Sequence, residues 1–197
     1  DESGIGPQTR VSDLRLMVTL QQKPQQHDHF RFWTNARFFK SVRQVWDALC
    51  HGPLFRTFVT LEVQGLDRLQ GQTGPVMFVA NHLSYLDQLA VMFALPPEIR
   101  SKTATAAWEE FFFGDHRGLD RLWRRLSYEY ASILFNLFPL PQSQGFGGSL
   151  RFMGRLADAG INILLFPEGG HSRDGALQPF QPGLGVMAKE LGIPVIP

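Results

Sequence analysis

Short apolar runs alternate with amphipathic stretches along most of this chain. Buried strands are predicted at Val76 to Ala80, Lys102 to Ala106, Ile161 to Phe166 and from Ile193 onward, with a further strand around Thr57 to Val63. Helical periodicity covers Phe30 to Leu49, Leu119 to Leu137, Leu150 to Ala159 and Gly185 to Leu191. This alternation predicts an α/β fold, a layered central sheet flanked by helices, with an amphipathic helix near the N-terminus.

Turn and cap signals set the limits of these elements. His51-Gly52-Pro53 predicts a break after the first helix, and Pro96-Pro97 ends the helix that follows the Val76 strand. Ser149 is expected to cap the helix from Leu150, while Gly160 and Gly192 close helices.

Polar clusters follow two of the predicted strands. Asn81-His82-Leu83-Ser84-Tyr85-Leu86-Asp87 comes after the first, and Phe166-Pro167-Glu168-Gly169-Gly170-His171-Ser172 after the other. Because parallel strands joined by helical crossovers carry their functional loops on one edge, the two clusters are expected to converge.

The first cluster predicts a hydrogen-bonded His82–Asp87 pair, with His82 in the strand-to-helix turn and Asp87 inside the next helix. Asn81 or Ser84 can cap that helix, and an apolar stripe would bury it: Leu83, Leu86, Leu89, Ala90 and Phe93. A carboxylate orients imidazole and stabilises its protonated form, so His82 can take a proton from an alcohol. The alternative is a His and an Asp that merely cap a surface helix.

The second cluster places Glu168 on the same rim. Pro167 ends strand pairing, and Gly169 and Gly170 permit positive φ or a close approach of backbone to a ligand. An ordinary tight turn is the alternative, although it would not need a glutamate.

With these motifs in order, the chain resembles the glycerolipid (lysophospholipid) acyltransferases, of the 1-acylglycerol-3-phosphate acyltransferase type. Asn81, His82 and Asp87 match the family's first motif, Phe166 to Gly169 with Ser172 match the third, and Ile193-Pro194-Val195-Ile196-Pro197 matches the fourth. The resemblance covers roughly Val59 to Pro197 and implies a glycerol-phosphate acyltransferase-like fold.

The resemblance implies direct transfer, in which His82 with Asp87 activates an acceptor hydroxyl that attacks an acyl thioester. Acyl-CoA or acyl carrier protein would be the co-substrate, with no cofactor and no metal. The implied substrate-binding residues are Asn81, Ser84, Phe166, Pro167, Glu168, Gly169, Ser172 and Arg173.

The family's second motif differs in this chain. The family usually has an arginine that holds the acceptor phosphate, whereas this stretch reads Phe138-Pro139-Leu140-Pro141-Gln142. The lysine often found beside Phe180 is absent too. Since bidentate phosphate recognition favours arginine, both losses weaken the case for a glycerol-phosphate acceptor, unless Arg151, Arg155 or Arg173 substitutes.

Composition adds bounds on function. The 197 residues fit one domain, 44% hydrophobic content suffices for a core, and a formal charge of +1 gives no general attraction to nucleic acid. The single cysteine, Cys50, excludes an internal disulfide framework and fits a reducing compartment. The sequence contains neither a Gly-x-Ser-x-Gly nucleophile elbow nor a Gly-x4-Gly-Lys phosphate loop. His27-Asp28-His29 is expected to be solvated rather than metal-binding.

Aromatic and basic residues gather in two stretches, Phe30 to Trp46 and Trp108 to Phe138, while no apolar run is long enough to span a bilayer. Such helices can lie in a membrane interface, which predicts a peripheral enzyme on the cytoplasmic face with a membrane lipid as substrate. Packing of both stretches on the core is the alternative.

The expected organisation is a polar lead at 1–29, a membrane-docking amphipathic segment at 30–56 and an acyltransferase domain at 57–197, cut at its C-terminus. The lead resembles linkers that join such domains to an acyl-activating ligase. Transfer of an acyl group to a lysophospholipid ranks first, ahead of an inactive lipid-binding domain and a lipid or thioester hydrolase.

Overall fold

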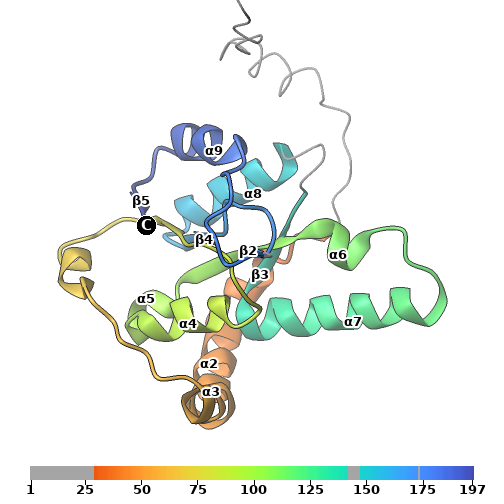
Figure 1. Ribbon diagram of the computed structural model, residues 1–197, viewed down its shortest axis with the longest axis horizontal. Coiled ribbons are helices and arrows are strands. Elements are labelled where there is room, and N and C mark those ends of the chain that lie inside the picture. Colours follow the sequence, from red (N-terminus) through yellow and green to blue (C-terminus); the bar gives the residue numbers. More distant parts are fainter. Residues whose placement is uncertain (1–28, 142–146, 173) are drawn as a thin grey trace, which may run out of the picture.

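The computed structural model describes residues 29–141, 147–172 and 174–197, so nearly all of the predicted lead lies outside the described residues. Its centre is a five-stranded sheet in the order β3-β2-β4-β1-β5, in which every neighbouring pair is parallel. The strands are β1 (Met77–Val79), β2 (Thr103–Trp108), β3 (Leu137–Leu140), β4 (Asn162–Leu165) and β5 (Val195–Ile196). The predicted α/β layered sheet is confirmed (Figure 1).

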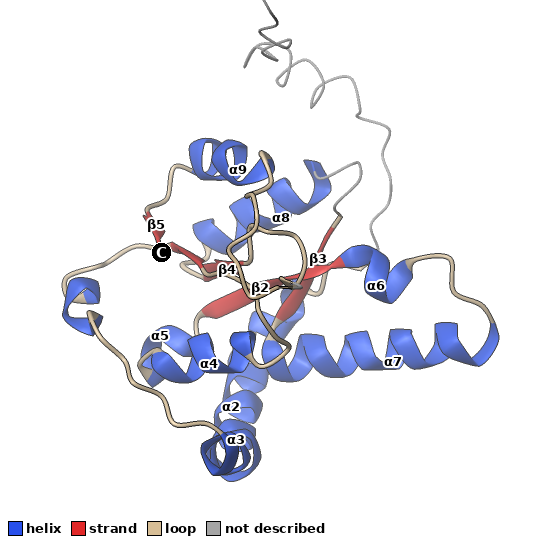
Figure 2. Ribbon diagram, viewed as in Figure 1, coloured by secondary structure: helices blue, strands red, loops and turns tan. Residues whose placement is uncertain are grey.

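Helices connect the strands and cover the sheet (Figure 2). Before β1 lie η1 (Phe32–Asn35), α2 (Arg37–Trp46), the π-helical turn η2 (Asp47–His51), α3 (Gly52–Phe58) and η3 (Leu66–Leu69). The later helices are α4 (Asp87–Ala94), α5 (Pro97–Arg100), α6 (Glu109–Phe113), α7 (Gly118–Phe135), α8 (Gly147–Asp158) and α9 (Gly183–Leu191).

Successive side chains along β1 and β4 lie on opposite faces of the sheet, in two different layers of the core. Met77 and Val79 point to the face covered by α8 and α9, where they pack with Phe152, Met153 and Leu156. Phe78 and Leu164 point to the opposite face, which α4 and α5 cover. A strand buried on both faces needs continuous apolar sequence, and this explains why β1 and β4 were recognisable.

A third apolar cluster joins α6 and α7 to the edge strand β3. Phe112, Tyr128, Ala131 and Leu137 are buried in it. Figure 1 shows that the first half of α7 extends beyond the sheet, so only its later turns belong to the core.

The strand predicted around Thr57 to Val63 is wrong. The helix continues through Gly52 and Pro53 to Phe58, because proline in a first helical turn lacks only an N–H that has no helical partner there. A Cβ at Gly52 would lie 2.6 Å from the Asp47 carbonyl oxygen, so glycine permits the tight π-helical turn rather than a break. The β-branched residues that follow pair with no strand among the described residues.

Three further details depart from the sequence prediction. Ser149 lies inside α8 and donates from its hydroxyl to the Pro139 carbonyl, so it does not cap the helix. Leu83 and Leu86 precede α4 and are 47% and 49% exposed, so they do not extend its buried stripe. The α7 helix ends at Phe135 because Asn136 takes a left-handed conformation, with φ 54°.

Candidate active site

Two loops meet at the carboxyl edge of the sheet because their strands are neighbours. Val79 pairs with Leu165 in the β1–β4 ladder, and Ala80 N–H donates to the Leu165 carbonyl at 3.1 Å. The two polar clusters therefore emerge side by side, which confirms the convergence expected from parallel topology.

The predicted His82–Asp87 pair is present. His82 Nδ1 lies 3.0 Å from Asp87 Oδ2, with His82 in the turn and Asp87 as the first residue of α4. The Asp87 carboxylate also accepts from the N–H groups of Leu83 and Ser84 and from the Ser84 hydroxyl. Burial acts to raise the pKa of Asp87, but these hydrogen bonds outweigh it and hold the pKa below its ordinary value. The carboxylate is therefore ionised and fixed.

Within the described residues, the second ring nitrogen of His82 is unpaired, whereas that of His51 is not. His82 Nε2 has no hydrogen-bond partner in the described residues, and the side chain is 18% exposed. By contrast, His51 pairs with Asp47 but its Nε2 accepts from the Trp46 indole at 2.9 Å. Among the described residues, three histidines pair with an aspartate: His51, His82 and His116. Of these, His82 is the one that lies in the two converging loops.

Glu168 joins the two loops. It is 7% exposed, and its Oε1 accepts from His82 N–H at 2.8 Å while its Oε2 accepts from Gln178 N–H at 3.0 Å. His82 is held from the other side as well, since its carbonyl accepts from Ser172 N–H at 2.7 Å. The glutamate thus fixes the backbone that carries the imidazole.

His171 is a residue of this site that the sequence reasoning did not select. The His82 ring stacks on Phe166 with centroids 4.1 Å apart and lies 4.0 Å from the His171 ring. Burial, together with the nearby His82, lowers the pKa of His171, so His171 is neutral at neutral pH. The sequence did carry a signal for this role, because His171 directly follows Glu168-Gly169-Gly170 in the second polar cluster.

The other predicted site residues take varied positions. Asn81 is exposed just after β1, Ser84 Oγ accepts from Leu86 N–H, and the Pro167 carbonyl accepts from Gln181 N–H. Gly169 has φ 76°, which a side chain would disfavour. Ser172 Oγ is within hydrogen-bond distance of Asp174 and Ala176. Arg173 lies outside the described residues.

The stretch that replaces the family's second motif forms the edge strand β3. Its last residue, Gln142, lies outside the described residues. Of the arginines suggested as substitutes, Arg155 stacks over the Phe32 ring at 4.6 Å and Arg151 is exposed on α8. Neither forms a hydrogen bond or an ion pair with the described residues of the two loops around His82.

This arrangement has the parts of a general base. An ionised carboxylate holds one imidazole nitrogen, two rings fix the plane of the imidazole, and the second nitrogen is left for a substrate hydroxyl. The described residues hold no group of three or more His, Cys, Asp or Glu side chains placed to bind a metal.

Comparisons with known proteins fit this chemistry. Residues 60–197 match the family model described as Acyltransferase. A 1-acyl-sn-glycerol-3-phosphate acyltransferase of Brassica napus, BAT2, described as chloroplastic, is 26% identical over 165 residues, which cover 82% of this chain and 42% of that protein. Its Arabidopsis thaliana counterpart LPAT1, also chloroplastic, is 24% identical over 165 residues, with 82% and 40% covered.

The chain therefore spans about two fifths of the length of the curated relatives it matches. Among solved structures, it is similar to PlsC, the 1-acyl-sn-glycerophosphate acyltransferase of Thermotoga maritima, with a TM-score of 0.45 and 20% identity over 84% of this chain and 71% of that one. The family model covers well over half of the residues, and the chain belongs to the acyltransferase family.

Proposed function

We propose that this protein transfers a fatty acyl group from acyl-CoA or acyl carrier protein to the free hydroxyl of a lysophospholipid such as 1-acyl-glycerol-3-phosphate. The observation that carries the proposal is the His82–Asp87 pair, held by Glu168 at the edge where the two loops meet. Membership of the acyltransferase family supports acyl transfer, and relatives named for 1-acyl-sn-glycerol-3-phosphate support the choice of acceptor class.

In the proposed reaction His82 Nε2 removes the proton from the acceptor hydroxyl as its oxygen attacks the thioester carbonyl. Asp87 stabilises the imidazolium that forms. The carbon–sulfur bond then breaks, the thiolate leaves, and the proton returns from His82 to the sulfur. Main-chain N–H groups near His82 would stabilise the oxyanion.

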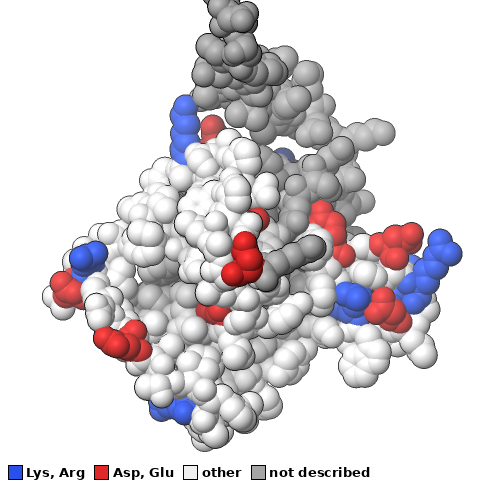
Figure 3. Space-filling view, viewed as in Figure 1, with Lys and Arg blue, Asp and Glu red and all other residues white. Residues whose placement is uncertain are grey.

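We further propose that the reaction takes place at a membrane surface. The described residues contain no helix long and apolar enough to cross a bilayer. Two sets of exposed apolar residues support docking: Phe38, Leu49 and Phe58 on α2 to α3, and Leu119, Leu122 and Trp123 on α7. Figure 3 shows a mostly uncharged surface over α2 and α3, with charges of both signs over α7.

Product analysis tests the proposal. The protein is incubated on anionic liposomes with an acyl-CoA or acyl carrier protein and a panel of lysophospholipids, and the lipid products are resolved. We expect a diacyl product with 1-acyl-glycerol-3-phosphate. Free fatty acid as the main product would instead indicate a hydrolase, and thioester left unconsumed with bound lipid would indicate a binding domain.

A further inference from the structure

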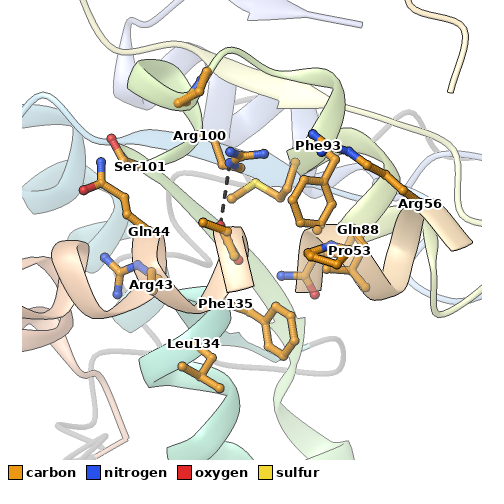
Figure 4. A pocket seen from close by; sticks show the side chains of 16 residues that line it. Arg43, Gln44, Pro53, Arg56, Gln88, Phe93, Arg100, Ser101, Leu134 and Phe135 are labelled. Atoms are coloured by element: carbon orange, nitrogen blue, oxygen red, sulfur yellow. Dashed lines mark ion pairs between the residues drawn. The ribbon is translucent and has the colours of Figure 1, made fainter. Parts of the chain in front are cut away.

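A cavity of about 430 Å³ lies between the N-terminal helices and α4. The η2 turn and helices α2 and α3 form one wall, and α4, α5 and the end of α7 form the other (Figure 4). Its volume is within the range of about 300–1,000 Å³ that is usual for small-ligand sites. On α4 the lining begins with Gln88, the residue after Asp87 of the candidate catalytic pair.

Positive charge exceeds negative charge in this cavity. Three arginines line it, Arg43, Arg56 and Arg100, against a single carboxylate, Asp47. That carboxylate is already shared, because Asp47 Oδ2 lies 3.6 Å from Arg100 Nε and Oδ1 lies 3.0 Å from His51 Nδ1. Arg56 is exposed and forms no ion pair with another described residue.

Two donors in the cavity wall are buried without a partner. Arg43 is 7% exposed; its Nη1 donates to the carbonyls of Thr34 and Ile133, but its Nη2 has no partner among the described residues. Gln88 Nε2 is likewise buried and unpaired within the described part of the chain. Leaving such donors unsatisfied is destabilising, and more so for a charged group.

The electrostatics beside the cavity favour an anion as ligand. Burial lowers the pKa of Arg43 to about 10, and its neighbour Asp47 only partly opposes this. Burial also lowers the pKa of Lys40, with further lowering by the positive charges of Arg43 and Lys102. An anion bound in the cavity would oppose the effect on Arg43, which lines it, because it would favour the charged guanidinium.

Apart from the polar Gln44 and Ser101, the rest of the lining is apolar. Leu89, Met92 and Phe93 of α4 face Leu134 and Phe135 at the end of α7. Arginine and amide donors beside an aliphatic and aromatic wall suit a phosphate group attached to a short apolar body. We propose that this cavity is a binding site for the phosphate group of a glycerolipid. It stands apart from the proposed reaction, because binding needs neither His82 nor turnover.

Methionine-methyl NMR tests this site directly. The full chain, labelled with ¹³C at its methionine methyl groups, is titrated with 1-hexanoyl-glycerol-3-phosphate, with inorganic phosphate and with uncharged 1-hexanoyl-glycerol. Met92 reports on the cavity, and Met187, in the core on the opposite face of the sheet, serves as the internal reference. We expect the phospholipid to shift the Met92 resonance saturably while that of Met187 stays in place.

Variants then assign the contact. Gln88→Leu should weaken the dissociation constant about fivefold, and Arg56→Gln about threefold, as expected for the loss of single hydrogen bonds or partly exposed charges. Arg68→Gln, an exposed arginine on η3, removes the same charge elsewhere and should bind as the wild type does. Thermal unfolding verifies that each variant is folded, and His82→Ala should retain the Met92 response while losing turnover.

The controls separate the sources of the phosphate. Tighter binding of the lipid than of inorganic phosphate supports a lipid ligand, whereas equal binding of both overturns the lipid part and leaves a site for free phosphate. A Met92 resonance that responds equally to the uncharged lipid, or that responds unchanged in both cavity variants, would overturn the phosphate site altogether.

Discussion

Glu168 is the side chain through which the two loops of the site hold each other in place. It accepts one main-chain N–H from each loop while almost completely buried. The Glu168→Gln variant keeps the shape of the side chain but replaces one acceptor oxygen with an NH₂ group. One of the two main-chain N–H donors is then buried without a partner. We expect a loss of about 1–3 kcal/mol in the free energy of unfolding, measured with urea, and slower acyl transfer.

Glu190→Gln, at an exposed position on α9, is the matched control for this change. If Glu168→Gln were as stable and as active as Glu190→Gln, the bridge would have no role in positioning His82.

His171 gives the site a dependence on pH. Its pKa is lowered in the folded protein by burial and by His82, so the fold binds a proton there less readily than the unfolded chain does. The stability that depends on neutral His171 is present above the unfolded pKa of about 6.5 and is lost as the pH falls below it.

The His171→Phe variant keeps a ring beside His82 and removes the titration. The free energy of unfolding of the variant, relative to that of the wild type, should therefore increase as the pH is lowered from about 7 to about 5. Urea titrations at each pH measure this difference. A difference between the two proteins that stays constant over this range would contradict the neutral, packed state of His171.

Individual residues also show what the sequence made predictable at the site. The His82–Asp87 contact followed from spacing and from position after a strand, because local geometry largely determines it. The contacts of Glu168 with Gln178 and of His82 with His171 depend on how one loop lies against another. No local pattern encodes that arrangement, so Glu168 was expected to contact ligand and its bridging position was not foreseen.

At the scale of elements, α7 carries an exposed apolar face. Leu119, Leu122, Trp123, Leu126 and Tyr130 recur at helical spacing and are each more than half exposed. Arg121, Arg124 and Arg125 flank this stripe, of which Arg124 is paired with Asp120. An apolar stripe with basic borders is typical of helices that lie in an anionic membrane interface.

Trp123→Ser should weaken binding to anionic liposomes by about tenfold or more, since burial of a large apolar side chain contributes about 1.5–3 kcal/mol. Flotation or sedimentation with vesicles measures this, and Leu66→Ser, an exposed leucine on η3, is the control. Equal vesicle binding by the Trp123 variant and the wild type would assign α7 some other role.

The elements that were predicted correctly share one property, which is that their own sequence pattern matches their burial. The strands β1 and β4 are continuous apolar runs buried on both faces, and α9 ends at Gly192 with φ 62°. The segment after Phe58 has β-branched residues but no strand to pair with, and propensity alone does not form a sheet.

The edge strand β3 was missed for a related reason. Helical periodicity runs on to Leu137, whereas the helix is ended by Asn136, whose side-chain amide donates to Asn35 and to the Thr103 carbonyl. This termination depends on partners far away in the sequence.

At the scale of the whole molecule, parallel topology is what turns two separate motifs into one site. The order β3-β2-β4-β1-β5 places β1 beside β4 although more than 80 residues separate their paired positions, as in Met77 with Ile163. The α/β class and the shared edge were predictable from the alternation of elements. The strand order and the cavity beside α4 were not, because both depend on how helices pack across the sheet.

In the proposed reaction His82, oriented by Asp87, is the base that activates the acceptor hydroxyl. The most direct test is the single-turnover rate of acyl transfer from acyl-CoA to 1-acyl-glycerol-3-phosphate by wild type, His82→Ala, Asp87→Asn and His116→Ala, a control histidine that pairs with Asp120. We predict rates about 10²–10⁴-fold lower for His82→Ala, a smaller loss for Asp87→Asn, and near wild-type rates for His116→Ala, with circular dichroism unchanged. Transfer at the wild-type rate by folded His82→Ala would contradict the account.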